Sequence, residues 1–182
     1  MFKPRGFSGD GEALERLKGW GLPLMALRWL AYVAIFLLRD YETLQPPFVE
    51  PPFGLDLGGY RLLEIYTAPV FGALLIGALV LTVWGYLRLR GQSAPVGRIL
   101  DAIGVAFFVP WLAVSVADLA LIHVGMWRLA VVAPIHTVVL GWESWAAVEL
   151  VGGRMTLKTS DTVILTLLLM FVWIALCAIW WR

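Results

Sequence analysis

A few ionisable side chains stand inside long apolar stretches of this sequence, where they have little access to water. They are Arg28, Asp118, His123, His136, Glu143 and Glu149. An ionisable group near the centre of a membrane helix costs roughly 2.5 to 3.5 kcal/mol on insertion scales, so each one needs a partner or a function. These residue types suit three roles: ion pairing between helices, haem ligation by imidazole, and proton relay.

Helix geometry predicts which of these groups share a depth. Asp118 lies seven residues before Gly125 and His136 eleven residues after it, so a turn at this glycine brings them within about 6 Å of one level. Glu143 follows His136 by two turns and returns to nearly the same face, and Arg28 lies at a comparable depth in the first apolar stretch. We therefore expect an intramembrane polar cluster of Arg28, Asp118, His136 and Glu143 that sets helix packing or binds a partner subunit.

Two functional alternatives use the same residues. His123 and His136 are candidate ligands for haem b, although His136 lies roughly 12 Å deeper, which disfavours one haem between them within a single hairpin. A chain of Asp118, His136 and Glu143 suits proton translocation. A haem-binding or quinone-binding electron-transfer subunit and a proton-coupled transporter are thus the alternatives.

Other kinds of chemistry have little support. The sequence contains no HExxH, GxSxG or P-loop motif, so we do not expect an enzyme that acts on its own. Its single cysteine, Cys177, excludes an intrachain disulfide, and no spacing suits a metal site. The net charge of +1 supplies no basic patch for nucleic acid.

The elements that position these groups are membrane helices. Hydrophobic residues make up 60% of the 182 residues and charged residues only 15%, and a span needs about 20 apolar residues. We predict an all-α bundle, 20–182, after an N-terminal cytoplasmic segment, 1–19. Its five spans are expected at 20–38, 68–87, 99–123, 127–151 and 162–181.

The connections predict the orientation. With the N-terminus in the cytoplasm, that side receives nine Lys and Arg residues and the opposite side four, which fits an N-terminus inside and a C-terminus outside. The proline-containing segment 39–67 is then an outside loop, and its second half, residues 55–66, is a candidate for a short interfacial helix. This pattern suits an integral protein of a bacterial inner membrane.

Smaller features make further predictions. Ala73 and Gly77 are spaced for close helix contact. Asp101 and Glu149 lie near helix ends and are expected to be solvated. Pro110 and Pro134 lie inside predicted spans, where polar groups must compensate the carbonyls that lose their donors.

The second span ends in VLTVWGYLRLRG, Val80 to Gly91. Together with the preceding helix and outside loop, residues 20–91 weakly resemble the PgaD-like accessory subunits of poly-N-acetylglucosamine synthases. The resemblance implies a small partner of a processive membrane glycosyltransferase. The three helices after residue 91 depart from that family's pattern.

These observations favour a non-catalytic accessory or structural subunit of a larger membrane complex, such as a polysaccharide synthase. Ten tryptophans and several interior polar groups in a small bundle are easier to explain if other membrane subunits, as well as lipid, cover its surface.

Overall fold

The chain is an all-helical bundle in a computed structural model that describes residues 16–42, 51, 54–153 and 157–180. Within these residues, five helices are long and apolar enough to cross a membrane, which confirms the predicted fold class. No strand occurs within the described ranges. Residues 1–15, most of the predicted N-terminal segment, lie outside them.

The first span is one continuous helical rod. It comprises α2 (Gly21–Tyr32), a π-helical turn (Val33–Leu37) and α3 (Leu38–Glu42). In the π turn the Leu38 N–H bonds to the Val33 carbonyl, five residues back. The rod extends four residues beyond the predicted end at residue 38.

The second span, α4 (Leu57–Leu89), is much longer than the predicted 68–87. The connection before it is therefore shorter than the predicted 39–67. The carboxylate of Asp56 accepts a hydrogen bond from the Gly59 N–H at 2.7 Å and so caps the helix start. Pro69 lies inside the helix without ending it. Residues 57–67, expected in the loop, therefore belong to the helix.

The remaining helices follow the prediction within a few residues at each end. They are α5 (Val96–His123), α6 (Leu129–Gly152) and α7 (Thr159–Trp180). Pro110 lies inside α5 and Pro134 inside α6, as expected.

We call the end of the bundle that carries the α4–α5 and α6–α7 connections the closed end, because the apolar core is concentrated there. The core draws on the second half of α4, the first halves of α5 and α7, and the second half of α6. Its fully buried members include Val83, Leu87, Ile99, Val148, Val151 and Leu165.

A close glycine contact joins α2 to α5 at the closed end. A Cβ atom on Gly104 would lie 2.3 Å from the Gly21 carbonyl oxygen, so the two backbones touch where neither residue has a side chain. Ala73 and Gly77 make no such contact among the described helices: Ala73 is exposed, and a Cβ on Gly77 would meet no atom within 4 Å. The spacing of small residues did not identify the pair because the contact joins distant segments.

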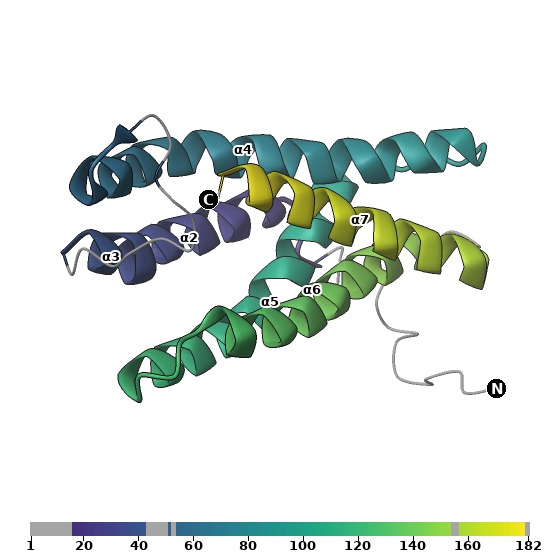
Figure 1. The fold of residues 1–182 in the computed structure, drawn as a ribbon. Helices are drawn as coiled ribbons and strands as arrows, with labels where there is room; N and C mark the ends of the chain where they lie inside the picture. The colour runs from purple at the N-terminus through teal and green to yellow at the C-terminus, as the bar shows by residue number, and fades with distance from the viewer. Residues whose placement is uncertain (1–15, 43–50, 52–53, 154–156, 181–182) are drawn as a thin grey trace.

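We call the opposite end, which carries the α5–α6 turn and the end of α3, the open end. Figure 1 shows the α5–α6 hairpin diverging from α4 toward this end. Among the groups singled out by the sequence, Asp118, His123 and His136 lie toward this end, whereas Glu149 lies near the closed end.

Candidate functional site: paired charges around an interhelical cavity

Arg28 and Glu143 form an ion pair between α2 and α6. The Arg28 Nη1 atom lies 3.1 Å from Glu143 Oε1, and both side chains are buried. Arg28 Nη1 also donates to the Phe107 carbonyl on α5. One guanidinium thus links three helices near the middle of the bundle.

Pro110 lies close to this contact in α5. Because proline has no N–H, it cannot donate to the Ala106 carbonyl, and the hydrogen-bond ladder of α5 is interrupted in this turn. Arg28 donates to the carbonyl of the next residue, Phe107, and so adds a polar contact beside the interruption.

Aromatic rings enclose the Arg28 guanidinium. Its central carbon lies 4.7 Å from the ring centroid of Trp173 and 5.8 Å from those of Phe107 and Trp111. Phe107 and Trp173 stack with centroids 5.1 Å apart. These cation–π contacts stabilise the charge where water is scarce.

Asp118 on α5 and His136 on α6 form a second pair. The His136 Nε2 atom lies 3.1 and 3.0 Å from the two carboxylate oxygens of Asp118. The Asp118 side chain is only 6% exposed, whereas that of His136 is 42% exposed. The structure therefore brings the four sequence-predicted residues together as two pairs.

A cavity of about 440 Å³ lies between α2, α5, α6 and α7. Arg28, Glu143 and His136 line it together with aromatic and aliphatic side chains. Its lining residues Thr137 and Ala178 are exposed, so the cavity opens at the surface. The Arg28–Glu143 ion pair and the Asp118–His136 pair thus border a space large enough for a small ligand.

The two histidines lie in different environments. His123 is exposed at the last residue of α5 and is not part of the cavity lining, whereas His136 lines the cavity and contacts Asp118. Haem ligation by this pair, and proton transport through the acidic and histidine groups, stay predictions. No group of three potential metal ligands occurs in the part of the chain that the structure describes.

Asp101 is buried, so the prediction that it is solvated is wrong. Its carboxylate accepts hydrogen bonds from the N–H groups of Gly19 and Gly21, at 3.0 and 2.9 Å. It therefore caps the start of α2 from a different helix, a role that only the α2–α5 contact creates. Glu149 is exposed, as expected.

A polar link between α4 and α7 at the closed end was not predicted from the sequence. Asp161, near the start of α7, accepts from the Tyr86 hydroxyl at 2.8 Å and pairs with Arg90 at the end of α4. The hydrogen bond and the charge of Asp161 raise the pKa of Arg90 above its ordinary value. The aromatic and basic residues that end α4 thus also attach it to α7.

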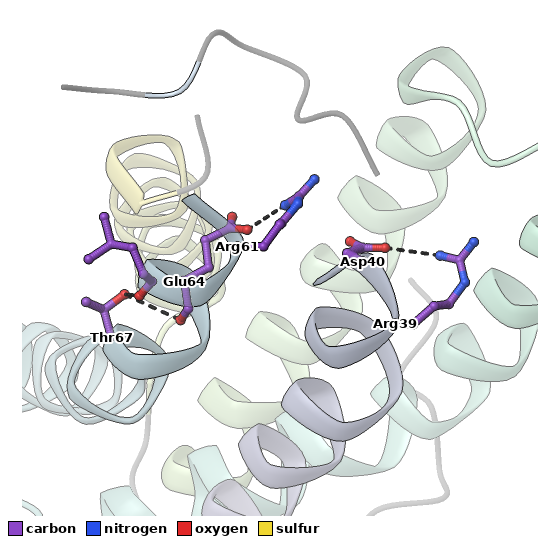
Figure 2. Close-up of polar contacts among 6 residues, drawn as sticks. Arg39, Asp40, Arg61, Glu64 and Thr67 are labelled. Atoms are coloured by element: carbon purple, nitrogen blue, oxygen red, sulfur yellow. Dashed lines mark hydrogen bonds and ion pairs between the residues drawn. The ribbon is translucent and has the colours of Figure 1, made fainter. Parts of the chain in front are cut away.

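Figure 2 shows two further ion pairs, at the open end. Arg61 and Glu64 pair on successive turns of α4 at 2.5 Å, and both are buried; Arg39 and Asp40 pair near the end of α3 at 3.1 Å. The Arg61 side chain extends from α4 toward α3 (Figure 2). Arg61 and Glu64 were expected in the outside segment, and their pairing within a long helix was not predicted.

No protein-family model, characterised protein or solved structure matches this chain.

Proposed function

We propose that this protein is a non-catalytic subunit of a larger membrane protein assembly. The observation that carries the proposal is an exposed stripe on α6, formed by Val138, Trp142, Trp145 and Glu149. Trp142 is 56% and Trp145 is 42% exposed. The spacings of four, three and four residues place all four side chains on one face of the helix.

The depth of the two tryptophans favours a protein partner over lipid. Trp142 and Trp145 lie ten and seven residues before the end of α6 at Gly152, or about 15 and 10 Å along the axis. Tryptophan facing lipid prefers the membrane–water interface, whereas an exposed tryptophan near mid-depth is typical of a protein contact. A transmembrane helix of a partner subunit fits this stripe.

The end of α4 supports a narrower proposal about the partner. Residues 80–91 carry the resemblance to PgaD-like subunits, and the Arg88 guanidinium there lies 5.3 Å from the ring centroid of Trp84. We propose a processive polysaccharide synthase of a bacterial inner membrane as the partner. In that setting the distribution of Lys and Arg favours a cytoplasmic N-terminus.

Co-purification tests the subunit proposal. The full chain, tagged and expressed in its own host, is purified in mild detergent as wild type and as Trp142→Leu/Trp145→Leu. A glycosyltransferase identified by mass spectrometry should accompany the wild type in fixed ratio and be lost from the variant. Phe171→Leu, which alters an aromatic residue that is 69% exposed on α7, is the matched control and should keep the partner.

Two results would count against the proposal. One is purification of the wild type as a self-sufficient monomer or homo-oligomer, and the other is full retention of the partner by the double tryptophan variant.

Cysteine labelling tests the orientation separately. In a Cys177→Ser background, Ser93→Cys and Ser160→Cys place thiols at exposed positions of the closed end. A membrane-impermeant maleimide should label both only after spheroplasts are opened. Labelling of either residue in intact spheroplasts would contradict a cytoplasmic closed end.

A further inference from the structure

The cavity between α2, α5, α6 and α7 has a combination of wall groups that limits what it can hold. Its acidic and basic wall residues are Arg28, Glu143 and His136. Arg28 and Glu143 face each other at 3.1 Å and neutralise each other, and the Asp118 carboxylate that contacts His136 is not part of the lining. The lining therefore has no permanent charge without an opposite partner, which favours a neutral ligand.

The rest of the wall is rich in aromatic rings. Trp29 and Tyr32 come from α2, Trp111 from α5, Trp127 from the start of the α6 segment and Trp173 from α7. Aromatic side chains from four parts of the chain can make stacked or edge-to-face contacts with a ligand that has a planar ring. The space between them, about 440 Å³, suits a single ring with its substituents and the beginning of a chain.

His136 supplies a hydrogen bond whose direction can change. Its Nε2 atom is engaged by Asp118, and its Nδ1 atom makes no hydrogen bond with any described residue. When Nε2–H donates to the carboxylate, a neutral imidazole presents Nδ1 as an acceptor for a hydroxyl; a protonated imidazole presents it as a donor to a carbonyl. The site can therefore recognise either oxygen group.

The opening of the cavity indicates how such a ligand arrives. The exposed lining residues Thr137 and Ala178 lie on membrane-spanning helices, so the opening faces the bilayer. A ligand that enters there partitions first into lipid, and an apolar chain attached to its ring can remain outside in the hydrocarbon.

We propose that this cavity binds the ring of a membrane-soluble quinone or quinol, with a ring oxygen on His136 Nδ1 and the isoprenoid chain in the bilayer. The proposal concerns binding alone and is independent of the α6 stripe on which the subunit proposal rests. It differs from the haem prediction because His123 has no part in it.

Binding is measured on the full chain in lipid nanodiscs, with a benzoquinone carrying one decyl chain as the probe and tryptophan fluorescence quenching as the readout. The wild type should show saturable quenching above that of protein-free lipid. His136→Gln should weaken the affinity about fivefold, the loss expected for one hydrogen bond. His123→Gln is the matched control and should bind as the wild type does.

A second pair of variants tests the cavity without touching the imidazole. Ala133 lines the cavity, whereas Ala130, one turn earlier on α6, is exposed outside it. Ala133→Phe should abolish saturable quenching and Ala130→Phe should preserve it, with circular dichroism confirming that both variants are folded.

The proposal is overturned if quenching is not saturable, or if His136→Gln and Ala133→Phe both bind as the wild type does. It is also overturned if excess decanol, which has the chain without the ring, abolishes the saturable quenching by the probe. Retention of partner subunits by the Ala133→Phe variant would show that loss of quinone binding and loss of assembly are separate.

Discussion

The two ends of this bundle differ in how their helices meet. At the closed end, backbone touches backbone at Gly21 and Gly104, and the surrounding apolar side chains are fully buried. At the open end the helices diverge, a cavity separates α2 and α7 from the α5–α6 hairpin, and polar pairs replace much of the apolar contact. The closed end therefore holds the helices together, while the open end has room for a ligand.

The difference in helix packing between the two ends explains why the polar pairs lie around the cavity. Apolar packing gives little net driving force between helices in lipid, so close backbone approach at one end supplies much of the association energy. The side chains that line a cavity have no packing partners on that side. Hydrogen bonds between charged side chains of neighbouring helices can keep these helices at a fixed separation there. Arg28 lies at the junction, with the core residue Phe107 on one side and the cavity on the other.

The largest effect is expected from Arg28→Met, which leaves Glu143 buried without its partner. Removal of one member of a buried pair costs about 3 to 5 kcal/mol, so the folded fraction should fall sharply in unfolding titrations with sodium dodecyl sulfate. The double variant Arg28→Met/Glu143→Met should recover most of that loss, because no isolated charge remains. A double variant as unstable as the single one would show that the packing around Arg28 matters more than its charge.

Gly104→Ala should destabilise the α2–α5 contact at the closed end. Its new methyl group meets the Gly21 backbone, which cannot move aside as a side chain can, and overpacking of this kind costs about 1 to 3 kcal/mol. Gly77→Ala is the control: with open space at that position, it should leave stability unchanged or raise it by about 0.5 to 1 kcal/mol. Equal effects in thermal melts would contradict the closed-end contact.

A third pair of variants compares the two ends with the same substitution. Val83 is fully buried in the closed-end core, whereas Val114 lines the cavity. Val83→Phe should lower stability by about 1 to 3 kcal/mol, and Val114→Phe should have a much smaller effect because its ring can enter the cavity. Similar melting temperatures for both variants would mean that the two ends are equally packed.

The smallest effect is expected from Arg90→Gln at the rim of the closed end. The Arg90 side chain is 45% exposed, so solvent and salt screen its pair with Asp161. The melting temperature should fall slightly at low potassium chloride and approach that of the wild type at high salt. A salt-independent loss as large as that of Arg28→Met would show that this rim contact is as important as the buried pair.

Much of the fold could be predicted from the sequence, because the length and apolarity of a span are local properties. The pairs Asp118–His136 and Arg28–Glu143 were placed at matching depths by counting residues along helices. Residues 55–66 were a candidate for a short separate helix, but their continuation into the second span was not predicted, because charged Arg61 and Glu64 argued against a membrane helix; in the folded chain they neutralise each other. Asp101 was misjudged because the N–H groups that it caps belong to another helix.

The sequence by itself determined that the chain spans a membrane as helices, since about 20 consecutive apolar residues have no other stable environment. It also determined which charges needed partners. Only the tertiary structure decided that Gly21 meets Gly104, that aromatic rings enclose Arg28, and that the α5–α6 hairpin leaves a cavity beside His136. These contacts depend on the crossing angles and separations of helices, which side chains far apart in the sequence set jointly.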